Sequence, residues 1–209
     1  MMNLDFYFPT PIWWIDTGLD NQRILDYCIN LRKNDPDGRE VSNFGGWQSN
    51  DIDCKQDLPE LVEFVMNQSD RIISDYGFDR SKTSLWFGNS WVNINKGKQW
   101  NQIHHHHGSF LSGVYYVQAT SDSGNIYFYK DFNQSFITTS YAKVESNTAL
   151  SAGLCYYPPK TGRLLLFPSN LLHSVDKSRD EEDRISIAFN IGISMIDIQQ
   201  RLLKELIYI

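Results

Sequence analysis

Apolar residues recur at helical spacing in two segments of the N-terminal third of the chain. The segments 20–33 and 59–76 each place hydrophobic side chains three or four positions apart, on one face of a helix. The second segment has Pro59 in its first turn and Gly77 directly after its last periodic residue, which are typical positions for the two ends of a helix. The pattern predicts a helical N-terminal layer over residues 1–83.

The period changes to that of β-strands from residue 84 to residue 194. Short runs of β-branched and aromatic residues alternate with turns rich in Gly, Pro, Asn and Asp. Because no helical pattern separates these runs, we expect antiparallel sheets and a mainly β, jelly-roll core. The predicted strands are 86–95, 110–119, 125–130, 135–144, 154–157, 164–167 and 184–193.

The C-terminal segment 195–209 returns to helical spacing, with leucines at 202, 203 and 206, and predicts a short closing helix. At 209 residues the chain is about the size of one domain, so we expect residues 1–209 to form a single unit. A homodimer formed through the N-terminal helices or this final helix is one arrangement that the pattern allows.

Composition excludes several classes of protein. A formal net charge of -6 is the wrong sign for affinity that comes from neutralising phosphates, so we do not expect non-specific nucleic-acid binding. No apolar run reaches the roughly 18 residues that a membrane span needs. The three cysteines form neither a disulfide framework nor a zinc motif, and residues 1–5 show no secretion signal, which together favour a reducing, cytoplasmic location.

All five histidines lie in two places, the run 104–107 and position 173. Because successive side chains of a strand point to opposite faces, His104 and His106 share one face and His105 and His107 share the other. Two imidazoles on one face can bind the same metal ion where a strand ends or bends, and His173 is the only other histidine that can add a third ligand. Adventitious metal binding by a short histidine tract is the alternative.

A second feature is the strict alternation of residues 184–190. It places Arg184, Ser186 and Asn190 on one face of a strand whose other face is apolar. A buried arginine needs an anionic partner, and its planar guanidinium suits a carboxylate. We therefore expect a bound carboxylate ligand, with an internal salt bridge to Asp131 or Asp176 as the alternative.

The ordered set of an HxH motif, a distal histidine and an Arg-x-Ser motif resembles the 2-oxoglutarate/Fe(II)-dependent oxygenases. The similarity is greatest to a group of such oxygenases from marine bacteria and their phages, within the prolyl-hydroxylase-like superfamily. It covers nearly the whole chain and rests on the segments 8–11, 45–49, 112–117, 167–169 and 184–190.

The resemblance implies a double-stranded β-helix core and a non-haem dioxygenase that uses O2 to hydroxylate an unknown substrate. It implies that His104, His106 and His173 hold Fe(II), and that the distal carboxylate of 2-oxoglutarate is bound by a second set of residues: Arg184, Ser186 and Tyr116. The wider superfamily usually has a carboxylate as the middle metal ligand. In this sequence His106 stands in its place.

Polar and aromatic residues near the histidine run are candidates for substrate contacts, and they are Trp91, Asn93, Asn95 and Asn101. Two other functions fit the same residues. One is a cupin-like metalloenzyme with three histidine ligands that does not use 2-oxoglutarate, in which Arg184 binds the substrate's own carboxylate. The other is a non-catalytic jelly-roll binding module.

Overall fold

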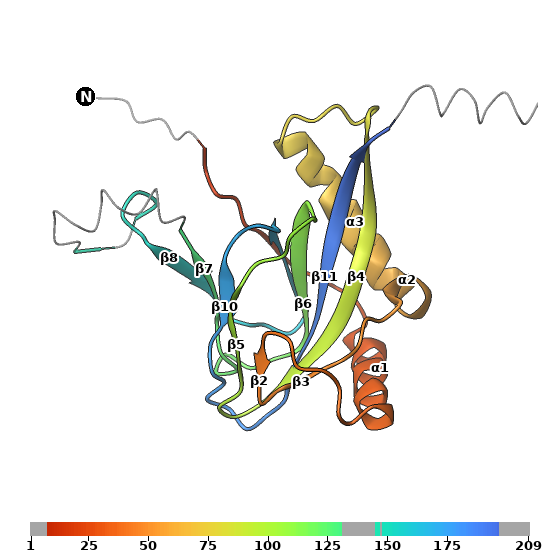
Figure 1. Ribbon diagram of the computed structural model, residues 1–209, viewed down its shortest axis with the longest axis vertical. Coiled ribbons are helices and arrows are strands. Elements are labelled where there is room, and N and C mark those ends of the chain that lie inside the picture. Colours follow the sequence, from red (N-terminus) through yellow and green to blue (C-terminus); the bar gives the residue numbers. More distant parts are fainter. Residues whose placement is uncertain (1–7, 131–144, 147, 197–209) are drawn as a thin grey trace, which may run out of the picture.

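Two antiparallel β-sheets face each other in the computed structural model, which describes residues 8–130, 145–146 and 148–196 (Figure 1). Helices cover the outer face of the larger sheet, and the inner faces of the two sheets enclose a cavity. The fold is mainly β, as the change of period along the sequence predicts.

The larger sheet has six strands. Its order is β1-β9-β6-β11-β4-β3, and every neighbouring pair is antiparallel. Its strands are β1 Trp13–Asp16, β9 Arg163–Pro168, β6 Leu111–Gln118, β11 Arg184–Met195, β4 Thr83–Asn95 and β3 Trp47–Gln48.

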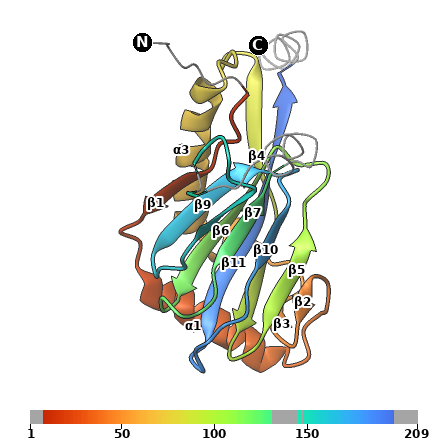
Figure 2. The same cartoon turned by 90° about the vertical axis from the view of Figure 1, so that its left-hand side faces the viewer.

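The smaller sheet has five strands in the order β2-β5-β10-β7-β8, again all antiparallel. Figure 2 shows these strands in front of the larger sheet. They are β2 Asn43–Phe44, β5 Trp100–His104, β10 His173–Val175, β7 Ile126–Tyr129 and β8 Leu154–Tyr157.

The helices are α1 Asn21–Asn34, α2 Cys54–Asp57 and α3 Pro59–Asp75. The side chain of Asp20 accepts a hydrogen bond from the backbone N–H of Gln22 and so caps α1. At the end of α3, Gly77 adopts a φ of 69°, a left-handed conformation that favours glycine and ends the helix. Both long helices therefore begin and end within one residue of the ranges that the sequence predicts.

The two faces of β11 have different environments. Ile185 and Ile187 lie in the core that the larger sheet forms with the helices, where they pack with residues such as Leu61 of α3. Arg184 and Ser186 face the other way, into the cavity between the sheets. The alternation read from the sequence thus separates a packing face from a polar face.

The differences from the sequence prediction concern short or terminal elements. The N-terminal layer contains three short strands, β1 to β3, as well as helices, and the short β5 and β10 flank the cavity. Strand β11 continues to Met195, one residue into the range predicted for the closing helix. The predicted strand 135–144 and residues 197–209 of that helix lie outside the described residues. None of the helices in the described part of the chain is long and apolar enough to cross a membrane.

Close packing at Gly113 of β6 gives a test of the core. A Cβ atom at this position would lie 2.5 Å from the ring of Phe189 and 2.8 Å from a methyl carbon of Leu166, both of which are buried. We expect Gly113→Ala to lower the free energy of unfolding by about 1 to 3 kcal/mol, the usual cost of overpacking. Urea denaturation measures the change. Gly18→Ala is the matched control, because a Cβ there meets nothing within 4 Å, and equal effects of the two substitutions would contradict this packing.

Candidate metal centre

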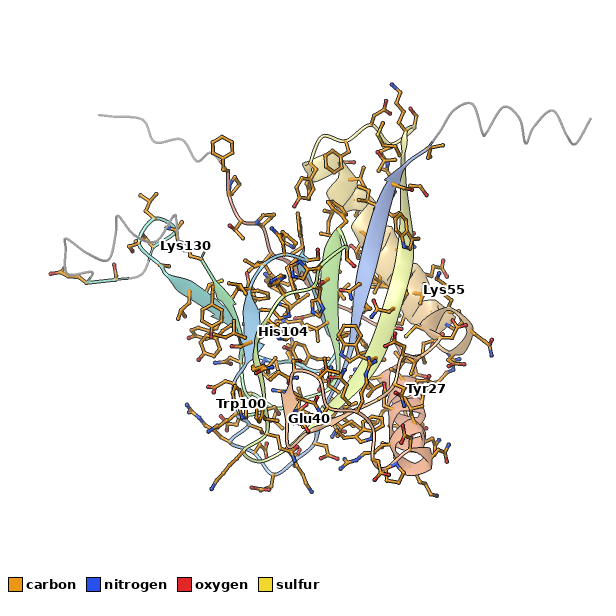
Figure 3. All side chains as sticks on the ribbon, in the orientation of Figure 1. Tyr27, Glu40, Lys55, Trp100, His104 and Lys130 are labelled. Carbon is orange, nitrogen blue, oxygen red and sulfur yellow. The ribbon has the colours of Figure 1, made fainter. Side chains whose placement is uncertain are left out.

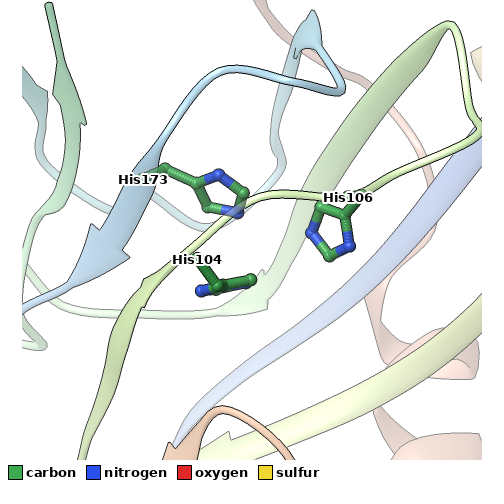
Figure 4. Close-up of side chains that lie close together, drawn as sticks. All are labelled: His104, His106 and His173. Carbon is green, nitrogen blue, oxygen red and sulfur yellow. The ribbon is translucent and has the colours of Figure 1, made fainter. Parts of the chain in front are cut away.

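Three histidines from two distant segments meet between the sheets. His104 is the last residue of β5, His106 follows it by two positions, and His173 is the first residue of β10. One ring nitrogen from each lies within 4.8 Å of the others. The ring centroids of His104 and His173 are 4.3 Å apart, and that of His106 lies 5.1 and 5.2 Å from these two. Figure 4 shows the three rings close together, with His104 and His173 on neighbouring strands and His106 on the loop that follows β5.

An irregularity in the β5–β10 pairing orients His104. His173 pairs with His104, whereas Val175, two residues later, pairs with Asn101, three residues earlier. One extra residue in β5 is therefore accommodated as a bulge, a feature that turns side chains toward a new face. As a result, Asn101 and His104 both line the cavity although three positions separate them. Figure 3 shows His104 in the space between the two sheets.

Backbone carbonyls fix the orientation of two of the imidazoles. The Nδ1 atom of His104 lies 2.7 Å from the carbonyl oxygen of Gln102, and that of His173 lies 2.9 Å from the carbonyl oxygen of Leu171. Because a carbonyl oxygen only accepts, Nδ1 is the donor in both rings and Nε2 keeps its lone pair. This arrangement is typical of metal-ligating histidines, whose second nitrogen donates to an outer partner.

Burial keeps all three imidazoles neutral. Burial first, and the neighbouring imidazoles second, lower the pKa of His173 to about 3 and the pKa of His106 to about 4. Burial also lowers the pKa of His104. Neutral imidazole is the form that binds a metal ion, so protons do not compete for these nitrogens at neutral pH.

The other two histidines of the run lie apart from this group. The rings of His105 and His107 contact each other, with centroids 4.0 Å apart, and neither belongs to the group of potential metal ligands. The division of the run into two faces is the one that the alternation of a strand predicts. It holds although β5 ends at His104.

Arg184 lies deeper in the same cavity. Its side chain is 2% exposed, and its Nη1 atom donates hydrogen bonds to the backbone carbonyl oxygens of Ser123 and Gly124, at 2.6 and 3.3 Å. Among the described residues no carboxylate forms an ion pair with Arg184, and this includes Asp176. Asp131, the other partner considered from the sequence, lies outside the described residues.

Tyr116 and Ser186 complete this inner end of the cavity. They are direct neighbours in the pairing of β6 with β11, and both line the cavity together with Arg184. Burial raises the pKa of Tyr116 to about 12, while the positive charge of Arg184 opposes this rise. The phenol is therefore a neutral hydrogen-bond donor next to a buried cation, a combination that suits a carboxylate.

The predicted substrate residues are divided by the structure. Trp91, Asn93 and Asn101 line the cavity, and Oδ1 of Asn93 is buried without a hydrogen-bond partner. Asn95 does not line it. The turn between β2 and β3 covers Asn95, since a Cβ on Gly46 would lie 2.4 Å from the Asn95 amide nitrogen. The loop residue Ser42 also lines the cavity, and no motif in the sequence marks it.

Comparison with protein families connects this arrangement to a known chemistry. Residues 89–190, just under half of the chain, match the family described as "Putative 2OG-Fe(II) oxygenase". This segment contains all three histidines of the centre, together with Arg184, Ser186 and Tyr116. No curated protein sequence matches the chain.

Several solved structures share the fold at low sequence identity. A prolyl-4-hydroxylase from Pseudomonas putida matches with a TM-score of 0.56 and 15% identity, over 87% of this chain and 92% of its own. A prolyl hydroxylase from Trichoplax adhaerens, in complex with a hypoxia-inducible-factor peptide fragment, matches with a TM-score of 0.57 and 17% identity over 92% and 86%. HygX from Streptomyces hygroscopicus, with nickel and 2-oxoglutarate bound, matches with a TM-score of 0.54 and 13% identity over 88% and 83%.

The double-stranded β-helix fold predicted from the sequence is therefore confirmed. The family match supports a 2-oxoglutarate- and Fe(II)-dependent oxygenase, hence an oxidoreductase. The fold is similar to that of the prolyl hydroxylases. Such an enzyme uses O2 and a substrate. The grouped histidines supply a place for the metal ion that this chemistry requires.

Removal of single histidines tests the metal centre. We expect His104→Ala and His173→Ala each to weaken the binding of Fe(II), measured anaerobically by calorimetry, by more than the roughly 10- to 100-fold that loss of an outer-shell partner costs. His105→Ala is the matched control from the same run, and we expect it to keep one metal ion per chain. Unchanged binding in His104→Ala, or a loss in His105→Ala, would show that other atoms hold the metal.

Proposed function

We propose that His104, His106 and His173 bind Fe(II), and that Arg184 grips the distal carboxylate of 2-oxoglutarate with help from Ser186 and Tyr116. The observation that carries this proposal is the position of a buried guanidinium, without a counter-ion among the described residues, in the same cavity as three neutral imidazoles. A buried charge of this kind is costly unless an anion pairs with it.

The donor set fits such a pair of cofactors in charge as well as in shape. Three neutral imidazoles leave the full charge of a divalent ion uncompensated, since the described residues place no carboxylate among the lining of this cavity. A dianionic co-substrate bound at the metal and at Arg184 would offset two of these three positive charges. The three-histidine set therefore makes the centre more dependent on a bound anion than a set with one carboxylate.

When bound, Fe(II) and 2-oxoglutarate supply an oxidation in which O2 is consumed, 2-oxoglutarate is converted to succinate and CO2, and a C–H bond of the substrate is hydroxylated. The chain itself orients these groups and excludes water. Val114, Ile126 and Phe167 form apolar walls of the same cavity. We propose that Trp91, Asn93 and Asn101, which line the same cavity, contact the reacting groups.

A cupin-like enzyme without 2-oxoglutarate is the second candidate. The observation in its favour is His106, which stands where the wider superfamily has a carboxylate ligand. In that enzyme Arg184 would bind the carboxylate of the substrate. The two candidates differ in one measurable property, because only the first needs 2-oxoglutarate as a ligand of the metal.

We also propose a reducing, cytoplasmic environment, supported by Cys28, Cys54 and Cys155, which are all free thiols. The net charge of -6 supports the expectation that non-specific nucleic-acid binding plays no part. A homodimer stays a prediction, and gel filtration with light scattering tests it.

Spectroscopy of the loaded protein separates the candidates. We expect anaerobic addition of Fe(II) and 2-oxoglutarate to give a weak visible charge-transfer band, because the keto acid chelates the metal through its own chemistry. Arg184→Ala should weaken the binding of 2-oxoglutarate by about 2 to 5 kcal/mol, the usual cost of truncating one partner of a buried charge pair. It should leave Fe(II) binding intact. A titration followed by this band measures both quantities.

Arg163→Ala is the control for this experiment. Arg163 also forms charged hydrogen bonds, with Asp16, but it lies on β9 and does not line the cavity, so we expect a much smaller change in 2-oxoglutarate affinity. Arg184→Lys keeps the charge and tests the role of the planar guanidinium if the alanine variant folds poorly. Tight Fe(II) binding without any band would favour the cupin-like enzyme, and equal loss of Fe(II) and 2-oxoglutarate would make Arg184 a structural residue.

A further inference from the structure

A second pocket adjoins the metal centre on the side away from Arg184. It shares Ser42, Trp91, His104 and His106 with the inner cavity. The ring of Trp91 packs against that of His106, with centroids 5.5 Å apart. A molecule in this outer pocket therefore contacts the same two histidines that face the inner cavity, so it has direct access to the metal centre.

Two opposite charges lie side by side in the wall of this outer pocket. Nη2 of Arg39 lies 2.6 Å from a carboxylate oxygen of Asp51, and both residues line the pocket. Their side chains are 31% and 52% exposed, so a ligand can reach either charge. The backbone N–H of Arg39 donates to the carbonyl oxygen of Gln48, at 2.8 Å, which anchors this segment to β3.

A chain of hydrogen bonds orients a third polar group, the amide of Asn89. The Ser112 hydroxyl donates to Oδ1 of Asn190 at 2.7 Å, and Nδ2 of Asn190 donates to Oδ1 of Asn89 at 2.9 Å. The oxygen of the Asn89 amide is thus occupied, and its nitrogen is left to donate. Asn89 is exposed and lines the outer pocket, whereas Ser112 and Asn190 are buried.

These three groups define the charge of a complementary ligand. A ligand with only negative charge would meet the Asp51 carboxylate, and one with only positive charge would meet the Arg39 guanidinium. A purely apolar ligand would leave an ion pair and an amide without compensation for lost water. A ligand with one carboxylate and one ammonium group satisfies all three.

We propose that the outer pocket binds a zwitterionic, amino-acid-like substrate, with its carboxylate at Arg39 and Asn89, its ammonium at Asp51 and its side chain toward His104 and His106. This inference rests on the oxygenase function proposed above and names the substrate class of that site. Asn89, Arg39 and Asp51 are then specificity-determining residues. Ser112 and Asn190 are positioning residues that act through Asn89.

The test uses the twenty common L-amino acids as probes. Each is titrated into the full chain loaded with Ni(II) and 2-oxoglutarate, and binding is followed by ligand-observed saturation-transfer NMR. We expect at least one amino acid to bind, and its analogues without the amino or the carboxylate group to bind about tenfold or more weakly, since each loses a hydrogen bond to a charged group.

Substitution of Asp51 locates the ammonium site. Asp51→Asn should weaken the binding of the amino acid about tenfold or more. It should leave the affinity for the analogue without an amino group unchanged. Asp16→Asn is the matched control, because Asp16 also pairs with an arginine, Arg163, but lies in β1 at the edge of the larger sheet. Asn89→Ala should weaken the binding of amino acids and the binding of the analogues that keep only the carboxylate by the same factor.

The inference would be overturned if no amino acid bound, if the analogues without the amino or the carboxylate group bound equally well, or if Asp51→Asn and Asp16→Asn behaved alike. The charge-transfer band with Fe(II) and 2-oxoglutarate is recorded on the same variants. A band in the absence of amino-acid binding would refute the substrate class alone. The absence of a band in the unsubstituted protein would refute the oxygenase proposal itself.

Discussion

The pairing of β5 with β10 is the interaction on which the candidate site depends. These strands lie about seventy residues apart in the sequence, and their hydrogen bonds place His104 directly opposite His173. The bulge in β5 then turns His104 and Asn101 into one cavity. The same region is held at its other end, where the backbone N–H of His106 donates to the carbonyl oxygen of Ser169 at 2.8 Å. The backbone hydrogen bonds thus hold the imidazoles in one group, which is the kind of support that a functional site needs.

The two faces of the larger sheet have different roles, because one packs in the core and the other lines the candidate site. One face packs against the helices in a continuous apolar core, while the other carries Arg184, Ser186 and Tyr116 toward the cavity. Strand β11 lies between β4 and β6, and its apolar face packs in the core. This packing offsets the unfavourable free energy of burying a guanidinium on the opposite face. A Cβ atom at Gly113 would lie 2.5 Å from the ring of Phe189, which shows how tightly the strands around that residue are packed.

Much of this arrangement is readable from the sequence, and the reasons for the rest are physical. Periodicity identifies α1, α3 and the longer strands because long segments repeat their pattern several times. It misses β5 and β10, because Trp100–His104 and His173–Val175 lack the run of apolar and aromatic residues that marks the equally short β7 and β8. Composition alone draws attention to the five histidines. Asn95 shows the limit: its strand face is that of Asn93, but the turn at Gly46 covers it, and no local pattern reveals which loop covers a given side chain.

The inner cavity and the outer pocket differ in charge, because no carboxylate belongs to the three-histidine set. The inner cavity has positive charge at Arg184 and, once a metal ion is bound, at the three imidazoles. Both charges attract an anion into this cavity. The outer pocket differs, because Arg39 and Asp51 balance each other. An anion is therefore drawn to the inner cavity and a ligand without net charge to the outer pocket. Two ligands of different charge can in this way be sorted to opposite sides of His104 and His106, as an enzyme that must bind a co-substrate and a substrate together requires.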